Sequence, residues 1–514
     1  MNIKHLEEKL LAIYDNIIEY EPLAKKIATN SHPAHKLSAM NLLGYLVLRA
    51  HDLRKLHDAL SDHGISSLRT CEGYVHSNLY NVIKLVKMLQ GKKWEDKHQI
   101  NRLKYSKSKK LIRTRARRLF NPGSRTNFTE IMVTLPTEAA ENKKLIKRLV
   151  KGGMEIARIN LSHDNMKIWK KMISNIKAVR KETKRDVKIY MDLAGPKIRT
   201  SEIKVRNTKG EVKNNLRLAA GDYLVLTKKK TLGKKVKVKV GDKEINVARV
   251  GVLLPQIIDD IKIGDEVYFD DGMIKGIVKA KSKTNAELLI TAAYKAKLSS
   301  NKGINLPNTS LNLPSLTNKD LELLPFVSKN ADIVGYSFVR TPRDVRMLYK
   351  ELEKLGDHST GVVFKIETKD AFENLPLILF QGMKREHIGV MIARGDLAVE
   401  IGFERISEVQ SEILWFCEAA HVPVIWATQV LETLAKKGKA TRAEITDAAH
   451  SAQAECVMLN KGPYIVDAVR TLKNVLMKME RHGFKKKDQM RGLHTAEYAL
   501  AKLKRLKKSK KIVS

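Results

Sequence analysis

The sequence predicts an α/β protein: a TIM-type (β/α)8 barrel with an inserted small β-barrel lid and an N-terminal α-helical region. Three observations predict it. Eight short apolar runs alternate with amphipathic helical patterns after residue 130, which favours a closed parallel barrel over an open sheet. About a hundred residues of different texture follow the third run, and the first 126 residues carry only helical patterns.

The first element is the helical region 1–126. Apolar residues recur at helical spacing in "KLSAMNLLGYLVLRAHDLRKLHDAL" and again in "SSLRTCEGYVHSNLYNVIKLVKML". A basic stretch from Lys104 to Arg118 then leads to the chain breaker "NPGS". The sequence therefore predicts that this region ends near residue 126.

The barrel is predicted in two parts, 127–200 and 303–480, from its apolar runs. Patterns such as "NKKLIKRLVKGG" and "RISEVQSEILWFCEAA" supply the intervening helices. The predicted strands are 130–135, 155–162, 187–194, 332–339, 361–367, 388–393, 422–428 and 455–460.

The insert, residues 201–302, has short β runs separated by Gly-Asp and Asp-Gly turns, as in "GDEVYFDDGMIKGIVKA". An insertion after a barrel strand lies over the catalytic face, where a lid would be. Residues 481–514, which end in "KLKRLKKSKKIVS", are predicted to form a basic C-terminal tail.

The net charge and the amino-acid composition limit which binding partners and which cellular compartment we expect. The chain has 96 basic and 56 acidic residues, a net charge of +40, which attracts polyanions or phosphorylated metabolites unless the lysines are simply solvated. Cys71, Cys417 and Cys456 are few and far apart, so a disulfide framework and a zinc site are not indicated. With no apolar leader and no run long enough to span a bilayer, we expect a cytoplasmic protein that does not bind membranes.

Polar residues collect where the predicted strands end, which is where barrel enzymes carry catalytic groups. They are Arg158, Asn160 and Ser162 on the second strand, Asp192 on the third, Ser337 on the fourth, Lys365 and Glu367 on the fifth, Ala393-Arg394-Gly395-Asp396 after the sixth, and Thr428-Gln429 after the seventh. A buried core would not select such a set.

The residue types indicate phosphoryl or carboxylate chemistry. Glu367 and Asp396 could share a hard cation such as Mg²⁺, while Lys365 and Arg158 suit charge on a transferring phosphoryl group. The segment 393–396 opens a predicted helix whose backbone N–H groups could hold a carboxylate. No Walker A pattern and no G-x-G-x-x-G is present, so a nucleotide site would be of another kind.

Eight ordered motifs carry a resemblance to a known family. They are "IARINLSHD", "MDLAGPKIRT", "FDDGMI", "NKGINLP", "FKIET", "MIARGDLAVEIG", "VIWATQVLETL" and "TRAEITD". In order and spacing, from about residue 126 to 475, the chain resembles the pyruvate kinase family. The resemblance implies phosphoryl transfer from phosphoenolpyruvate to ADP, giving pyruvate and ATP, with Mg²⁺ (or Mn²⁺) and a homo-oligomeric assembly.

The resemblance also implies residue roles. Glu367 and Asp396 would bind Mg²⁺, Lys365 with Arg158 would stabilise the phosphoryl group, and Thr428 would help to protonate the enolate. The substrate-binding positions would be Ala393, Arg394, Gly395, Asp396 and Thr428. The nucleotide-side positions would be Asn160, His163, Arg199 and Lys302. Asn160, Ser162 and Asp192 match monovalent-cation ligands.

The chain departs from the family at several positions. "TLPTEA" and "MLNKGPY" alter two nucleotide-side loops, the family's C-terminal allosteric domain is expected to be missing, and residues 1–126 have no counterpart. Lys197 stands where K⁺-dependent members have glutamate, and K⁺-independent members resemble this sequence. Leu193 replaces a usual threonine. We therefore expect that K⁺ is not required and that the Lys197 ammonium supplies its charge.

Two alternatives stay open. A relative with the same Mg²⁺ site could act as an aldolase or lyase through a pyruvate enolate, although Asp271 in the lid and "GPKIRT" argue against it. A degenerate barrel could instead bind polyanions through its +40 charge. No motif that reads RNA or DNA supports this second alternative, so nucleic acid is not an expected partner.

Overall fold

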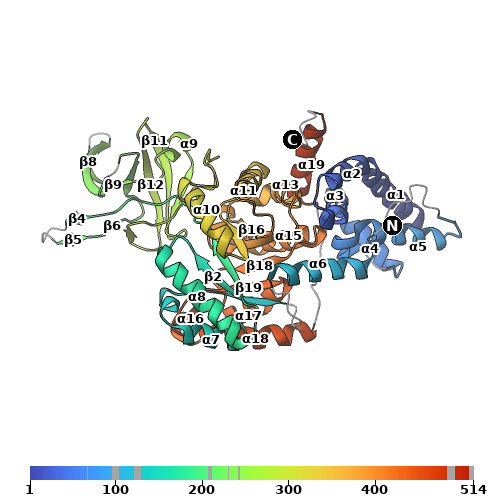
Figure 1. The fold of residues 1–514 in the computed structure, drawn as a ribbon. Helices are drawn as coiled ribbons and strands as arrows, with labels where there is room; N and C mark the ends of the chain where they lie inside the picture. Colours follow the sequence, from blue (N-terminus) through green and yellow to red (C-terminus); the bar gives the residue numbers. More distant parts are fainter. Residues whose placement is uncertain are drawn as a thin grey trace.

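The structure, a computed structural model, has three parts: a central barrel, a β-rich lid on one side of it and a group of N-terminal helices on the other (Figure 1). The residues described are 1–65, 68–94, 103–120, 129–206, 211–229, 231–240, 243–482 and 492–508. The predicted boundary near residue 126, with its "NPGS" breaker, lies outside them.

The barrel is closed and all its strand pairs are parallel. Each predicted apolar run contains one strand, which confirms the (β/α)8 prediction. The strands are β1 (Glu130–Thr134), β2 (Ile156–Asn160), β3 (Lys188–Asp192), β15 (Ile333–Tyr336), β16 (Gly361–Ile366), β17 (Ile388–Ala393), β18 (Val424–Ala427) and β19 (Cys456–Leu459).

Helices surround the barrel. They are α7 (Lys143–Gly152), α8 (Met166–Thr183), α10 (Asn318–Asn330), α11 (Pro342–Lys354), α12 (Lys369–Glu373), α13 (Leu375–Gly382), α14 (Arg394–Ile401), α15 (Ile406–Ala419), α16 (Glu432–Lys437), α17 (Arg442–His450) and α18 (Ile465–His482). Thr317, Thr341 and Thr441 begin three of these helices with capping boxes, which satisfy backbone N–H groups that the helix leaves free. The predicted helix after the sixth strand is confirmed as α14.

The N-terminal region is helical, as predicted. It contains α1 (Ile3–Glu19), α2 (Glu21–Thr29), α3 (Lys36–Arg49), α4 (Arg54–Asp62), α5 (Val75–Met88) and α6 (Tyr105–Phe120). Helix α3 is buried on almost every side, as expected of a helix that is apolar all round. The Asn41 side chain donates to the Glu72 and Ala419 carbonyls at 2.6 and 2.8 Å, so it joins this region to the barrel helix α15.

Helix α6 contains the basic stretch that the sequence places before the breaker. Leu119 and Phe120 are buried in one cluster with barrel-interior residues such as Met132 and Val363. A Cβ atom added to Gly361, the first residue of β16, would lie 2.4 Å from Leu119. The stretch is therefore a docked helix that covers the N-terminal mouth of the barrel, opposite the catalytic face.

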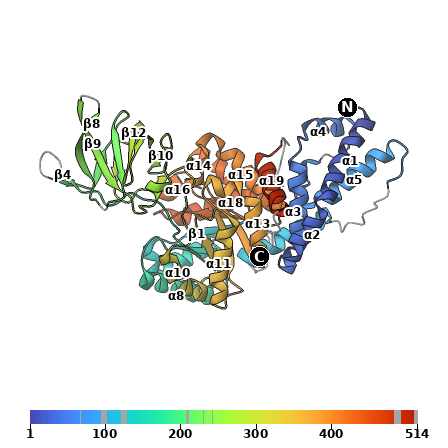
Figure 2. The ribbon, with the colours of Figure 1, turned by 90° about the horizontal axis from the view of Figure 1, so that it is seen from above.

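The insert forms the predicted β domain with its own core, which includes Leu224, Phe269 and Ile290. Its main sheet contains β7 (Tyr223–Thr227), β8 (Lys234–Val240), β9 (Lys243–Gly251), β10 (Glu266–Phe269), β11 (Ile274–Lys281), β12 (Asn285–Ala293) and β14 (Ile304–Asn305). Smaller elements are β4 (Val205–Arg206), β5 (Val212–Lys213), β6 (Asn215–Arg217), β13 (Lys297–Ser299) and α9 (Ile257–Asp260). Figure 2 shows this domain beside the barrel. Because β14 belongs to the sheet, the domain extends beyond the predicted boundary at residue 302.

The predicted basic tail, 481–514, is wrong for its central part. Residues His494–Lys508 form helix α19, which lies against α3, α12 and α13. Ala496, Ala499, Leu500 and Leu503 are buried, and this helical spacing of apolar residues explains why the segment packs rather than remaining solvated. Residues 483–491 and 509–514 lie outside the described part of the chain.

Across the residues described, no helix combines the length and apolar character that crossing a membrane requires.

Candidate functional site

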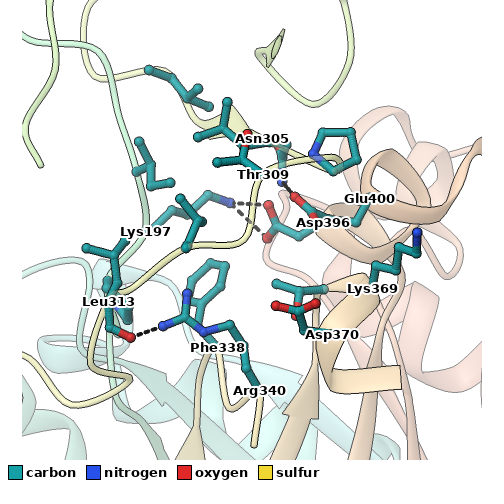
Figure 3. Close-up of a pocket in the computed structure, with 17 residues that line it drawn as sticks. Lys197, Asn305, Thr309, Leu313, Phe338, Arg340, Lys369, Asp370, Asp396 and Glu400 are labelled. Atoms are coloured by element: carbon teal, nitrogen blue, oxygen red, sulfur yellow. Dashed lines mark hydrogen bonds and ion pairs between the residues drawn. The ribbon is translucent and has the colours of Figure 1, made fainter. Parts of the chain in front are cut away.

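The C-terminal ends of the barrel strands carry two neighbouring cavities. The first, of about 40 Å³, lies between the barrel and the base of the lid, and its wall includes Lys197, Asn305, Arg340, Asp396 and Glu400 (Figure 3). The second, of about 240 Å³, is lined by residues that include Thr134, Arg158, Asn160, His163, Lys436 and Lys461. Arg158, which lines the second cavity, and its ion-pair partner Asp192 are both buried.

A buried network of alternating charges occupies the ends of β2, β3 and β16. The Asp192 carboxylate accepts from Arg158 Nε at 3.2 Å and from Lys365 Nζ at 3.1 Å. Lys365 also lies 3.0 Å from Glu367 Oε1 and donates to Ser337 Oγ at 2.8 Å. The Asp192 and Lys365 side chains are only 1% and 9% exposed, so each charge depends on its partners for stabilisation.

The partners fix the protonation states of this network. Burial disfavours the ionised carboxyl of Asp192, but Lys365 and Arg158 outweigh it and lower its pKa. Burial likewise disfavours the Lys365 ammonium, but Asp192 and Glu367 outweigh it and raise its pKa. Both groups are therefore charged at neutral pH, and a carboxylate can end the buried strand β3 because two cations surround it.

Glu367 carries negative charge that the network compensates only in part. Burial raises its pKa; Lys365 lowers it, and the carboxylates of Asp396 and Asp192 raise it again. Its Oε2 accepts from the Phe338 N–H at 2.7 Å, and Phe338 has a φ of 54°, a left-handed conformation that is strained for a bulky residue. A cation beside Glu367 and Asp396 would relieve this repulsion, so the pair fits a hard metal ion.

Two carboxylates could contribute to a metal site here. Among the residues that the structure describes, no group of three or more His, Cys, Asp or Glu residues could hold a metal ion. Glu367 and Asp396 would then leave the other positions to substrate and water oxygens, as Mg²⁺ sites commonly do.

Lys197 is bound to the second predicted Mg²⁺ ligand. Its Nζ lies 2.9 Å from both carboxylate oxygens of Asp396 (Figure 3). Lys197 also interacts electrostatically with Asp271 of the lid. Burial raises the pKa of Asp271, Lys197 lowers it and Asp396 raises it. The Lys197 ammonium therefore supplies positive charge where the barrel and the lid meet.

The predicted monovalent-ion ligands lie on neighbouring strand ends and have other partners. Asn160 Oδ1 accepts from the Ser162 N–H at 3.0 Å, and Asn160 is paired in register with Asp192. Asp192 Oδ2 binds Arg158 and Lys365, whereas Asp192 Oδ1 is buried without a hydrogen-bond partner in the described structure. Ser162 is exposed. The Asp192 Oδ1 atom is therefore the one oxygen of this carboxylate that the described cations leave without a hydrogen bond.

Arg394 anchors the loop that precedes α14. Its guanidinium donates to Ala427 O at 3.0 Å and to Asp447 Oδ2 at 2.9 Å, and it stacks on the Trp426 ring at 5.0 Å. Because these contacts use the hydrogen-bond donors of the guanidinium, we infer that the Arg394 side chain positions the loop and does not contact the substrate.

The predicted substrate positions 393–396 and Thr428 come together, as their motifs require. The Gly395 N–H donates to Thr428 Oγ1 at 2.9 Å. Thr428 has a φ of 68° and Gln429 a φ of 59°, conformations that are uncommon for such residues and that concentrate at functional sites.

The second cavity contains part of the predicted nucleotide side. Partial burial lowers the pKa of His163, and the cations Lys461, Arg199 and Arg158 lower it further. The Asp164 carboxylate raises it. Arg199 donates to Asn301 O at 3.0 Å, and Lys302 pairs with Asp270 at 2.8 Å. The structure therefore groups Asn160 and His163 in this cavity and places Arg199 and Lys302 at the lid hinge.

Four residues near the site are absent from the sequence prediction: Lys436, Lys461, Asp447 and Glu400. Lys461 follows the eighth strand closely, and Glu400 lies one helical turn after Asp396, so strand-end position and i, i+4 spacing could have indicated both. Burial raises the pKa of Glu400 to about 7. The Asp396 charge also raises this pKa, whereas the hydrogen bond from Asn305 lowers it. Asn305 Nδ2 donates to Glu400 Oε1 at 3.2 Å.

Comparisons with known proteins agree with this geometry. The family model described as "Pyruvate kinase, barrel domain" matches residues 126–469. The pyruvate kinase of Staphylococcus saprophyticus is 32% identical over 359 residues, 68% of this chain and 57% of that protein. The pyruvate kinase of Geobacillus stearothermophilus is 31% identical over 360 residues, 69% of this chain and 57% of that protein.

A solved structure of this family is also similar to the chain. The crystal structure of a pyruvate kinase from Cryptosporidium parvum matches with a TM-score of 0.59 and 26% identity over 70% of each chain. The match to the curated relatives spans 57% of their length. From its closed barrel, its inserted lid and this similarity, we conclude that the chain belongs to the pyruvate kinase family.

Proposed function

We propose that this protein is a pyruvate-kinase-type phosphotransferase that converts phosphoenolpyruvate and ADP to pyruvate and ATP. The observation that carries the proposal is the buried Lys365, whose ammonium lies between Asp192 and Glu367 at the end of β16. A permanently charged group in a site of low dielectric is what a transferring phosphoryl group requires.

The proposed reaction assigns a task to each cluster. A terminal phosphate oxygen of ADP attacks the phosphorus, and the bond from phosphorus to the enol oxygen breaks. Lys365, with Arg158, stabilises charge on the phosphoryl oxygens during this transfer. Glu367 and Asp396 would hold Mg²⁺, which supplies further charge stabilisation when bound.

The enolate that remains must gain a proton at its methylene carbon to give pyruvate. Thr428 Oγ1 accepts from the Gly395 N–H, so its own hydroxyl hydrogen stays available for another partner. We assign this hydroxyl to the delivery of that proton, while the N-terminus of α14 would face the substrate carboxylate.

The nucleotide would bind in the second cavity. Its lining includes three cations, Arg158, Lys436 and Lys461, and two carboxylates, Asp164 and Glu432, the second of which pairs with Lys436. The cations suit a diphosphate, and the neutral His163 can donate one hydrogen bond. Arg199 and Lys302 at the lid hinge would approach the phosphates when the lid closes. The three cysteines are all buried; a cytoplasmic location and a homo-oligomer stay predictions.

A coupled assay tests the proposal. Pyruvate would be followed by NADH oxidation through lactate dehydrogenase, and ATP by luciferase, with phosphoenolpyruvate, Mg²⁺ and each of several nucleoside diphosphates. Equal amounts of pyruvate and ATP are expected. Release of pyruvate from an oxo acid without any nucleotide would support the aldolase or lyase alternative instead, and no turnover together with polyanion binding would support the degenerate barrel.

The cofactor requirement is part of the proposal: Mg²⁺ or Mn²⁺ is needed, and K⁺ is not. We expect full activity with Mg²⁺ in buffers whose ionic strength is set by tetramethylammonium, because the Lys197 ammonium is always present. Lys197→Glu should lower this activity at least tenfold, since it would place a third carboxylate beside Asp396 and Asp271. Added K⁺ should restore part of the loss.

The matched control is Lys204→Glu, the same charge reversal at an exposed lysine that pairs with Glu202. It should leave both the activity and its independence of K⁺ unchanged. A wild-type protein that is inactive until K⁺ is added would contradict this assignment of Lys197.

A further inference from the structure

A partly open cavity of about 460 Å³ lies outside the catalytic face, between helices of the N-terminal region, the barrel and the C-terminal segment. Its lining residues come from α2 and the turn after it, from the first turns of α11, from α13 and its ends, and from α19. Figures 1 and 2 show α13 and α19 between the barrel and the N-terminal helices. The cavity is thus present only when all three parts are assembled.

One wall of this cavity is apolar. Ile27, Leu377, Phe380 and Leu503 line it, each less than a tenth exposed. The volume is of the size that a small organic molecule fills.

Other lining residues of this cavity are cationic. Arg343, Arg346, Lys384 and Lys502 line the cavity, and none of the described lining residues is Asp or Glu. Lys502 donates to Asn374 Oδ1 at 2.7 Å. Arg343, Arg346 and Lys384 are exposed, and four cations lining one cavity make its potential positive, which favours an anion.

The positions of the arginines strengthen this interpretation. Arg343 lies in the first turn of α11, which begins at Pro342, and a helix N-terminus favours negative charge. Within the described residues, neither Arg343 nor Arg346 has a carboxylate partner that would offset this cost. Both arginine side chains are exposed, so they are accessible to an anion that enters the cavity from solution.

The cavity contacts the catalytic site through Asn374. The Asn374 side chain accepts from Lys502 and donates from Nδ2 to Arg340 O at 3.1 Å and to Asp370 O at 2.9 Å. Arg340 and Asp370 both line the cavity that contains Asp396. One buried amide therefore joins the rim of the outer cavity to the backbone of the catalytic one.

We propose that the cavity between α2, α11, α13 and α19 binds a small organic anion that joins an anionic group to an apolar part, and that its occupation alters the catalytic site through Asn374. The binding goes beyond the phosphotransferase function and does not depend on it. The effect on catalysis rests on that proposed function.

The binding experiment uses the full chain without substrates and 8-anilinonaphthalene-1-sulfonate, which has a sulfonate and an aromatic part. Isothermal titration should show a saturable site, and Arg343→Gln with Arg346→Gln should weaken binding at least tenfold. Lys350→Gln is the matched control, because Lys350 is an exposed cation of the same helix that does not line the cavity. Inorganic phosphate, which has no apolar part, should bind at least tenfold more weakly than the probe.

Equal affinity of the double variant and the Lys350→Gln control would overturn the site, and phosphate binding as tight as the probe would overturn its amphiphilic character. Saturating probe should also change the KM for phosphoenolpyruvate at least threefold in the wild type and not in the double variant. An unchanged KM in an active wild type would overturn the coupling. An inactive wild type that still binds the probe through the two arginines would leave the site intact and reject the proposed function.

Discussion

Lys365→Met is expected to lower kcat for pyruvate formation by about a thousandfold, which corresponds to about 4 kcal/mol of transition-state stabilisation. The Lys365 ammonium is buried beside Asp192, Glu367 and Ser337. Methionine keeps a similar length and volume but removes the charge that offsets the negative charge of the transferring group. Because the site excludes water, solvent cannot replace this charge.

The same substitution also leaves Asp192 and Glu367 with less compensation, so the melting temperature should fall. Calorimetric binding of phosphoenolpyruvate and ADP below that temperature would show that the variant is folded when kcat is measured. Lys354→Met, which removes an exposed lysine on α11, is the matched control and should retain full activity. A kcat within tenfold of the wild-type value would show that Lys365 does not stabilise the transition state of the chemical step.

Glu367→Gln and Asp396→Asn are each expected to lower kcat by at least about a hundredfold without unfolding the barrel. Each removes one of two carboxylates that would hold the metal ion. The glutamine can still accept from the Phe338 N–H, so the local backbone should keep its conformation. The asparagine loses the ion pair with Lys197 but keeps the size of the side chain, so the barrel should still fold.

A second measurement separates metal binding from chemistry. The free Mn²⁺ signal in electron paramagnetic resonance should show Mn²⁺ affinity at least tenfold weaker in both variants than in the wild type. Glu353→Gln, at an exposed position on α11, is the control and should change neither affinity nor kcat. Wild-type Mn²⁺ affinity in either variant would exclude that residue as a ligand.

The local patterns of the sequence were sufficient for the main architecture. Each barrel strand lies within a predicted apolar run, because a strand buried on both faces must be apolar along its length. The inserted β domain was predicted from its turn residues, and α14 from its position after β17. The segment 494–508 forms a packed helix in place of the predicted basic tail, because Ala496, Leu500 and Leu503 recur at helical spacing and are buried on one face.

The candidate site was predictable as a set of positions but not as a set of contacts. Strand ends identify Asp192, Lys365 and Glu367, since side chains at the C-terminal ends of neighbouring parallel strands converge. The pairing of Arg394 with Asp447, and the presence of Lys461 and Lys436 in the second cavity, depend on loops whose course the sequence does not reveal.

By itself, then, the sequence determined the barrel, the lid, the N-terminal helices and the residues at the catalytic rim. These follow from periodicities of two and of 3.6 residues, which are properties of short segments. Only the tertiary structure decided that Lys197 binds Asp396, that α6 covers the barrel mouth, and that α2, α11, α13 and α19 line a cationic cavity. The physical reason is distance along the chain: Lys197 and Asp396 are 199 residues apart, and no local pattern specifies which distant charges folding brings within hydrogen-bonding range.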